Sequence, residues 1–213
     1  SQVARIKEYL KGLDLIVECP IRNAEMGLEK EERILFTQPG MRYCQAQTLV
    51  YSLMQDETFG QLTEDEKTFI TDRILEEVRG RMLEDIVLLE TMKALGRNYD
   101  VFKYQFSTGE YDMLIYGRNE RGCAAYEIKH SDKCVSEQSR HLRNENMLSL
   151  TTPRFGTLDG RYVLYLGENK DTEDGIAYRN AEQFLKALPE ISLTSGLEET
   201  ESEDETEGMQ PTM

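Results

Sequence analysis

The sequence predicts an α/β fold in which helices flank a mixed central β-sheet. The chain has 213 residues, of which 39% are hydrophobic and 31% are charged, and this composition supplies a core for one medium-sized domain. A long amphipathic segment precedes three short β-rich segments, and a further helical segment separates those from a fourth strand. Helices and strands that alternate in this way pack together as layers around a sheet.

The first 55 residues are expected to form a helix and a β-hairpin. Residues 3–12 place their apolar side chains on one helical stripe, and residues 13–21 and 32–40 have the pattern of two strands around a polar loop. A helix followed by a hairpin is the second half of a winged helix, whose first helices would lie upstream of Ser1 in a longer protein. A helix and hairpin that only pack on the next domain are the alternative.

Residues 56–189 are expected to form the principal domain, which begins with a long helix. Thr63 and Glu66 have the spacing of a capping box, and apolar residues recur every four positions to about Leu95, with Gly80 as a weak point. A further helix is expected at 41–55, at the end of the first segment. The other elements expected within 56–189 are helices at 135–149 and 180–188 and strands at 100–106, 110–117, 122–129, 161–167 and 175–178.

The chain is acidic, but its charge is unevenly spread. The net charge is −15, and residues 190–213 hold eight acids and no Lys or Arg, which leaves −7 on residues 1–189. This balance argues against a general, avid binder of polyanions, because phosphate neutralisation drives that kind of affinity. The tail at 190–213 is predicted to be disordered and solvating.

The cysteines and the hydropathy pattern predict a reduced, cytoplasmic protein without a membrane span. Cys19, Cys44, Cys123 and Cys134 form no CxxC motif, and no apolar run approaches the length of a transmembrane helix. His130 lies four residues before Cys134, but a zinc site needs two further ligands, which are missing.

A hairpin within residues 110–129 is predicted to bring two acids together. With the turn centred in the polar segment GRNERG, Asp112 lies opposite Glu127, and Glu110 lies opposite Lys129. Leu114 and Tyr116 continue the acidic face opposite Ala125 and Cys123. The pairs expected on the other face are Tyr111–Ile128, Met113–Tyr126 and Ile115–Ala124.

The opposed acids require something that relieves their repulsion. A raised pKa, a nearby lysine or a bound cation could do so, and Lys129 lies on the same strand face as Glu127. Two hard oxygen ligands with water suit Mg²⁺ or Mn²⁺, and a lysine beside such an ion can orient an attacking water. The cluster therefore has the components for phosphodiester hydrolysis, whereas a structural salt bridge is the alternative.

The acid-x-Lys spacing occurs at three places, but only one of them ends an apolar strand. The copies that start at Asp65 and Glu168 lie in a first helical turn and in a polar turn, whereas Glu127 ends a strand and has a second acid opposite. The segments GEYDMLI and AAYEIKHS together resemble the Asp…Glu-x-Lys signature of the PD-(D/E)xK nuclease superfamily. That resemblance implies a restriction-endonuclease-like fold.

The same resemblance implies a role for each residue of the cluster. Asp112, Glu127 and the backbone carbonyl of Ile128 would be metal ligands, and Lys129 would orient water or aid it electrostatically. In this superfamily a helix before the first core strand supplies a further acid, which GRMLEDIVLLETM offers as Glu84.

Most of residues 1–189 resemble uncharacterised C-terminal domains attached to bacterial and archaeal AAA-type ATPases. The resemblance rests on the order of IKEYLKGLDLI…ERILFTQPGMR, Gly-x-x-x-Glu, Gly-Glu-x-Asp, Glu-x-Lys and YVLYLG…GIAYRNAEQFL. It implies an upstream ATPase domain as partner. The chain itself has no Gly-rich phosphate loop ending in Gly-Lys-Ser/Thr, and Tyr111 replaces the usual Val before the Asp.

Three functions follow as alternatives. The first is a Mg²⁺-dependent nuclease module that cuts DNA or RNA delivered by an ATPase. The second is an inactive nuclease fold that serves as an interaction or regulatory module, which the net charge of −7 and the lack of a basic stripe favour. The third is a winged-helix reader of nucleic acid, for which a basic recognition helix is missing. The cations after the motif, which are interleaved with acids, are His130, Lys133, Arg140, His141 and Arg143.

Overall fold

The computed structural model describes residues 2–25, 31–119 and 122–194 and shows one mixed sheet with helices on both faces. The helices are α1 (Gln2–Gly12), α2 (Gly40–Met54), α3 (Glu64–Leu95), α4 (Glu145–Phe155) and α5 (Ala181–Thr194), with short 3₁₀ helices η1 (Glu57–Phe59), η2 (Ser136–Ser139) and η3 (His141–Arg143). The strands are β1 (Ile16–Asn23), β2 (Glu31–Phe36), β3 (Tyr99–Phe106), β4 (Gly109–Gly117), β5 (Gly122–Ile128), β6 (Thr157–Tyr165), β7 (Lys170–Asp171) and β8 (Ile176–Asn180).

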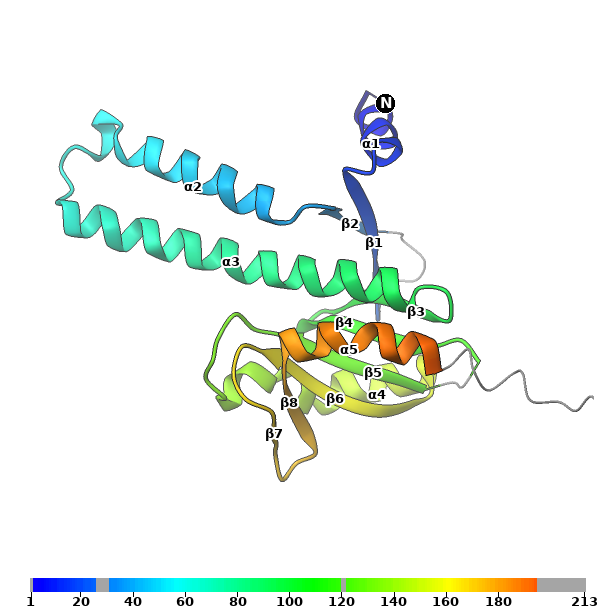
Figure 1. Cartoon of the computed structure of the whole chain (residues 1–213). Coiled ribbons are helices and arrows are strands. Elements are labelled where there is room, and N and C mark those ends of the chain that lie inside the picture. Colours follow the sequence, from blue (N-terminus) through cyan, green and yellow to red (C-terminus); the bar gives the residue numbers. More distant parts are fainter. Residues whose placement is uncertain (1, 26–30, 120–121, 195–213) are drawn as a thin grey trace, which may run out of the picture.

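The sheet has eight strands within the described ranges, in the order β2-β1-β3-β4-β5-β6-β8-β7. β1 pairs with β3 in parallel, and β5, β6 and β8 also run parallel, while the other neighbours are antiparallel. The α3 and α5 helices lie over one face of the sheet and α4 lies over the other (Figure 1). The predicted α/β fold with a mixed, helix-flanked sheet is therefore confirmed.

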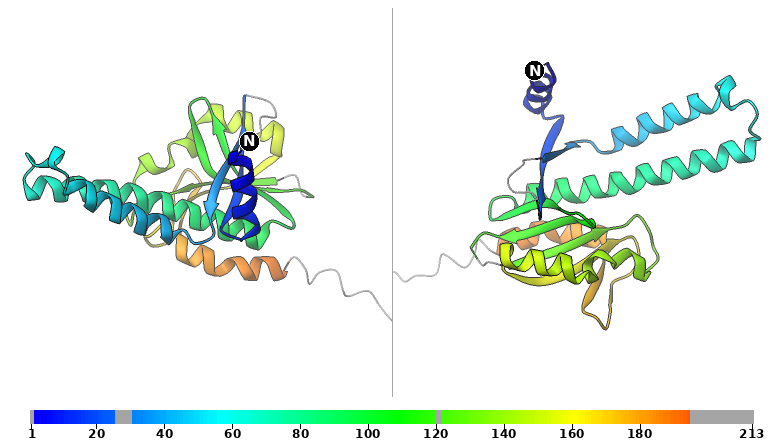
Figure 2. Two further views of the ribbon diagram at one scale, coloured as in Figure 1. Left: turned by 90° about the horizontal axis from the view of Figure 1, so that it is seen from above. Right: turned by 180° about the vertical axis from the view of Figure 1, so that it is seen from behind.

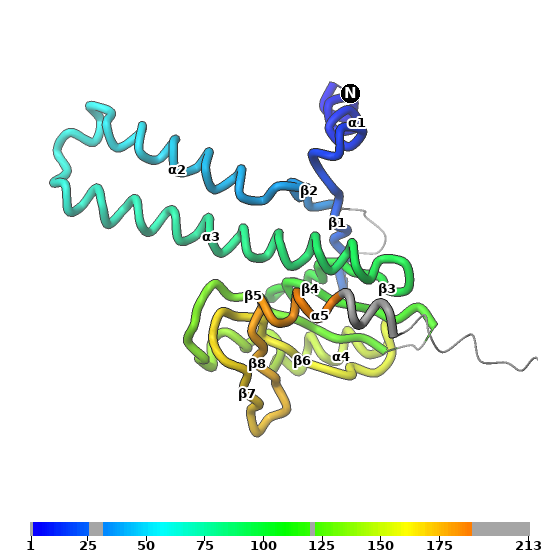
Figure 3. Tube along the Cα trace, in the orientation of Figure 1, coloured from blue at the N-terminus to red at the C-terminus, as the bar shows by residue number. Residues whose placement is uncertain are grey.

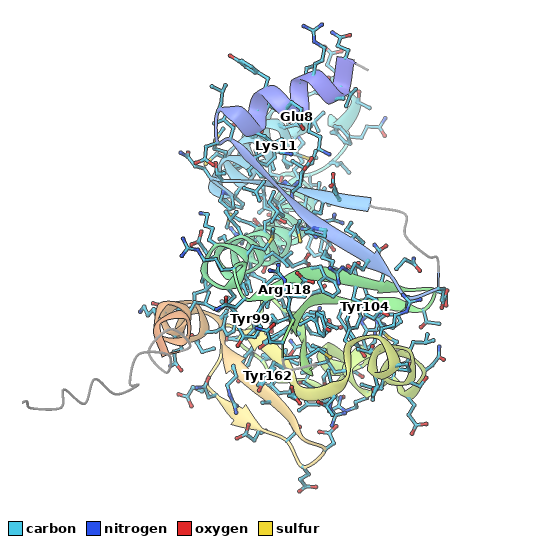
Figure 4. The ribbon with its side chains drawn as sticks, turned by 90° about the vertical axis from the view of Figure 1, so that its right-hand side faces the viewer. Glu8, Lys11, Tyr99, Tyr104, Arg118 and Tyr162 are labelled. Carbon is cyan, nitrogen blue, oxygen red and sulfur yellow. The ribbon has the colours of Figure 1, made fainter. Side chains whose placement is uncertain are left out.

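The N-terminal hairpin belongs to this same sheet. β1 and β2 extend its edge, so the expected division between residues 55 and 56 falls between α2 and α3 and not at a break in the sheet. The α1 helix, marked by Glu8 and Lys11 in Figure 4, stands away from the sheet body, which carries Tyr104. Ion pairs from Lys7 and Lys11 to Glu18 of β1 hold α1 in place.

Helices α2 and α3 form a hairpin, the arm, that projects from the sheet (Figure 2). The predicted capping box is confirmed, because Thr63 Oγ1 accepts from the Glu66 N–H while the Glu66 carboxylate accepts from the Thr63 N–H. The α3 helix has 32 residues and so is about 48 Å long. It continues through Gly80 and ends at Leu95, as predicted, and its C-terminal half lies on the sheet.

Two hydrophobic clusters hold the layers together, one on each face of the sheet. Figure 3 shows the path of the chain through these layers. The side chains of Phe102, Leu114, Met147 and Phe155 are among those that fill the α4 face. The α3 face is filled by residues that include Val87, Leu88, Met113, Tyr126 and Leu164. Strands that are covered on both faces explain the near-continuous apolar runs in the sequence.

The region after β5 differs from the prediction. The helix expected at 135–149 is replaced by η2 and η3, and α4 begins only at Glu145, because the Asn144 side chain accepts from the N–H groups of Asn146 and Met147 and caps it there. The α5 helix reaches Thr194, so the boundary expected at 190 lies inside a helix. The remainder of the tail, 195–213, lies outside the described residues. No helix in the described ranges is long and apolar enough to span a bilayer.

Candidate functional site

The hairpin of β4 and β5 has the predicted register. Four pairs, from Met113–Tyr126 to Tyr116–Cys123, fit it, and the ladder ends at the first of them. One step further, the N–H of Ile128 donates to Asp112 Oδ2 at 2.8 Å. The side chain of Asp112 thus takes the place of a backbone acceptor and points along the sheet toward β5.

A β-bulge in β4 aims Asp112 in this direction. Phe102 pairs with Leu114 and Tyr104 with Tyr111, so that Asp112 and Met113 together oppose one residue of β3. The extra residue turns Tyr111 onto the α4 face, whereas Ile128 packs on the α3 face. The prediction that Tyr111 and Ile128 share a face is therefore wrong, because unbroken alternation does not hold across a bulge.

Lys129 lies between the two predicted acids. Its Nζ is 2.8 Å from Asp112 Oδ2 and 2.5 Å from Glu127 Oε2. Asp112 is 5% exposed and Glu127 is 2% exposed, so both carboxylates are removed from water and share one counter-ion. The predicted convergence of Asp112, Glu127 and Lys129 is confirmed as geometry.

Glu127 has a second partner that the sequence did not identify as such. His141 of η3 places Nδ1 2.8 Å from Glu127 Oε1, and Arg140 Nε lies 3.1 Å from His141 Nε2. Because Nε2 accepts from Arg140, Nδ1 carries the ring proton and donates to Glu127. Gly109 packs against this ring with φ of 155°, and a Cβ there would lie 2.7 Å from His141 Nε2.

The α3 side of the site is built around Lys103, a buried residue of β3. Its Nζ lies 2.9 Å from Glu110 Oε1, 3.5 Å from Glu84 Oε2 and 4.0 Å from Asp112 Oδ1. Glu110 was expected to face Lys129, but its recorded ion pair is with Lys103. A lone lysine in the apolar strand VFKYQF was the sequence signal for this residue, since a buried lysine needs acidic partners.

The predicted acid Glu84 reaches the same region from α3. Its Oε2 accepts from Arg33 Nη1 at 2.9 Å as well as from Lys103. The next residue, Asp85, is 2% exposed and bonds Arg33 at 2.5 Å and Arg42 at 2.8 Å. These pairs fasten β2 and α2 onto α3 beside the cluster.

The pKa values of the acids are pushed apart. Burial raises the pKa of Glu127, and so does the nearby charge of Asp112, whereas the contacts with His141 and Lys129 lower it by less. Burial and the Asp112 charge also raise the pKa of Glu84. Burial alone would raise that of Asp112, but Lys129, the Ile128 N–H and Lys103 together lower it. The pKa of Asp112 is therefore lowered, whereas the pKa values of Glu127 and Glu84 are raised.

A cleft of about 420 Å³ opens beside the cluster between α3 and the sheet end. His130 joins its two sides, because its Nδ1 lies 2.9 Å from Glu76 Oε1 on α3. The lining residues carry both signs of charge: Arg33, Arg73, Glu76, Glu77, Arg81, Glu84, Lys103, Glu110, Lys129 and His130, with Gly80 and Ile128 between them. Of the cations after the motif, Arg143 instead bonds Asp174 and the Ser136 carbonyl.

The acids of the cluster supply oxygen donors, the kind of donor that hard divalent cations prefer. In the described ranges no three His, Cys, Asp or Glu side chains converge closely enough to hold a metal. Two carboxylates do converge, and the Ile128 N–H points from β5 toward Asp112. Because the N–H and C=O of one residue in an extended strand lie on the same side, the Ile128 carbonyl is expected on that side too. These would all be oxygen ligands, which Mg²⁺ and Mn²⁺ prefer, but the Lys129 ammonium already stands between the carboxylates.

Compared with protein-family models, curated proteins and solved structures, the chain gives no match.

Proposed function

We propose that this chain is a nuclease-like module that hydrolyses phosphodiester bonds of DNA or RNA with Mg²⁺ or Mn²⁺. The supporting observation is that Asp112 and Glu127, from two strands, meet at one cation position beside a cleft. The proposal includes a restriction-endonuclease-like fold and a winged-helix-like segment over residues 1–55. It also includes an AAA-type ATPase domain upstream, which would deliver the substrate.

In this proposal each residue at the cation position would have a distinct role in hydrolysis. Asp112, Glu127 and the Ile128 carbonyl would hold the ion, which when bound would polarise a phosphate oxygen and lower the pKa of a bound water. Lys129 would orient a water and balance negative charge on a phosphate, because its ammonium has three donors beside the carboxylates. Glu84 would supply the outer acid from α3, next to Lys103.

Cleavage of labelled DNA and RNA in Mn²⁺ or Mg²⁺ tests the proposal. Wild type should cleave at least one substrate, and Asp112→Asn should lose that activity because it removes a ligand charge with little change in shape. Asp132→Asn, an exposed acid in the loop after the motif, is the matched control and should cleave like wild type. Cleavage that survives in Asp112→Asn would contradict the proposal.

The second candidate is a module of the same fold that binds its ATPase and has no catalytic activity. The observation in its favour is that lysines of the chain itself already neutralise the acids, with Lys129 on Asp112 and Glu127 and Lys103 on Glu84 and Glu110. It predicts association with the ATPase part that needs no metal and is unchanged in Lys129→Ala. Loss of association upon chelation of divalent ions would exclude it.

A further inference from the structure

The helix α2 has an exposed surface without charge. From Tyr43 to Gln55 the sequence contains no Asp, Glu, Lys or Arg, although 31% of the residues in the chain are charged. The single charged residue of α2 is Arg42, and it turns toward α3, where its Nη1 bonds Asp85 Oδ2 at 2.8 Å. The exposed side of α2 is thus a charge-free strip on a highly charged protein.

The strip lies opposite the side of α2 that packs on α3. Tyr43 faces α3 and accepts from Arg79 Nη2 at 2.8 Å, and the buried residues of α2 are Val50 and Met54. A helix turns by 100° per residue, so residues about two positions away from Tyr43, Val50 and Met54 lie on the opposite side of α2. We call the following set the α2 face: Met41, Cys44, Gln45, Thr48, Leu49 and Ser52.

Exposed large apolar side chains lie in the arm and also around α1, where Val3, Ile6 and Tyr9 are exposed among the charged residues of that helix. Leu49 is 60% exposed, and Tyr51, Leu53, Phe69 and Ile74 of the arm are also exposed. Among the described residues after position 75, the exposed large apolar side chains are Val135 and Leu166. The arm carries α2 away from the sheet body, and α3 runs alongside it (Figure 2).

We propose that the α2 face is a contact between two copies of this chain. Each copy has a net charge of −15, so two copies repel each other through their charged surfaces, and the α2 face adds no charged group to this repulsion. A two-fold contact requires a surface that is complementary to itself, which an uncharged strip provides. A nucleic acid or the acidic segment 190–213 would find no cation on this face.

The length of the α2 face limits the area that two copies can bury. The α2 helix has 15 residues and is about 22 Å long, so two helices packed across the axis bury less than the roughly 800 Å² per partner of a standard interface. We therefore expect a reversible dimer whose population depends on concentration.

Light scattering of the full chain over concentrations from about 1 μM to about 500 μM tests this proposal. The measured mass should rise from the monomer value of 24.6 kDa toward twice that value as the concentration increases. Leu49→Glu should remain a monomer throughout, because it buries a charge at the contact. Leu166→Glu places the same charge on an exposed leucine of the sheet body and should dimerise like wild type.

Three outcomes would overturn the proposal: wild type that stays a monomer at every concentration, Leu49→Glu that dimerises like wild type, or Leu166→Glu that is equally impaired. Circular dichroism of both variants confirms that they are folded, and Thr48→Arg provides a second charge on the α2 face, for which the same loss is expected. All measurements are made in chelator, so that their result does not depend on the proposed metal site.

Discussion

Lys129 Nζ lies 2.8 Å from Asp112 Oδ2 on the neighbouring strand, and the same nitrogen contacts Glu127. The ammonium therefore stands where the two carboxylates from β4 and β5 converge. A buried acid pair needs a positive charge, which either a lysine or a divalent ion can supply. This shared requirement links the stability of the sheet end to its proposed chemistry.

Replacing Lys129 with Met should destabilise the fold, and a divalent ion should restore part of the loss. The variant leaves two buried carboxylates without their shared counter-ion, and breaking such a pair costs about 3 kcal/mol, less here because the Lys129 side chain is 31% exposed. Urea unfolding in chelator and in Mn²⁺ measures both effects.

Lys186→Met is the matched control for this variant. Lys186 pairs with Glu182 on the exposed surface of α5, with 73% of its side chain exposed. Its loss should leave the unfolding free energy almost unchanged and independent of Mn²⁺. A Lys129→Met variant that behaves like this control would show that the ammonium has no role at the acid pair.

The stability contributed by Glu127 should increase as the pH falls. The pKa of Glu127 is raised in the folded state, so the folded protein binds this proton more tightly than the unfolded chain does. The resulting stability is complete below the ordinary pKa of 4.5 and is lost as the pH rises through the folded pKa. Unfolding of wild type and Glu127→Gln in chelator, at about pH 7.5 and about pH 5, measures it. Wild type should gain stability relative to Glu127→Gln at the lower pH. A difference between the two proteins that does not change with pH would contradict this prediction.

His141 should position Glu127 for metal binding. Its Nδ1–H donates to Glu127 Oε1 at 2.8 Å, and removal of such a partner typically weakens metal affinity about 10- to 100-fold. We expect His141→Ala to show this loss in Mn²⁺ titration and His141→Asn, whose amide can donate in the same direction, to lose less. Equal affinities in wild type and His141→Ala would argue against this role.

Lys103→Met should destabilise the protein by about 2 kcal/mol, because Glu84 and Glu110 lose their buried cation. Removing one of the acids as well, in Lys103→Met with Glu84→Gln, should recover part of that loss. Thermal or urea unfolding of the two variants provides the comparison. A double variant that is less stable than Lys103→Met would show that the pair between Lys103 and Glu84 is not the source of the cost.

Local patterns in the sequence were sufficient to predict much of the fold. The capping box at Thr63, the long helix to Leu95 and the register of β4 with β5 all depend on neighbouring residues, and each is confirmed. The parallel pairing of β1 with β3 joins segments about 80 residues apart, and no local pattern specifies it. The helix predicted at 135–149 begins only at Glu145, because the Asn144 side chain caps it there.

The sequence predicted the main acids of the candidate site, but it did not predict the bulge and the histidine contact that position them. Asp112, Glu127 and Lys129 followed from strand periodicity and hairpin register. The bulge that turns Asp112 toward Ile128 depends on how β3 pairs with β4, which periodicity cannot show. The contact of His141 with Glu127 arises from the path of a loop, for the same reason.

Calorimetric titration of Mn²⁺ into wild type, Asp112→Asn and Asp132→Asn tests the metal site most directly. Wild type and Asp132→Asn should give saturable heat of binding, and Asp112→Asn should give none. Equal binding by wild type and Asp112→Asn, or no binding by any of the three, would contradict the claim that Asp112 and Glu127 form a divalent-cation site.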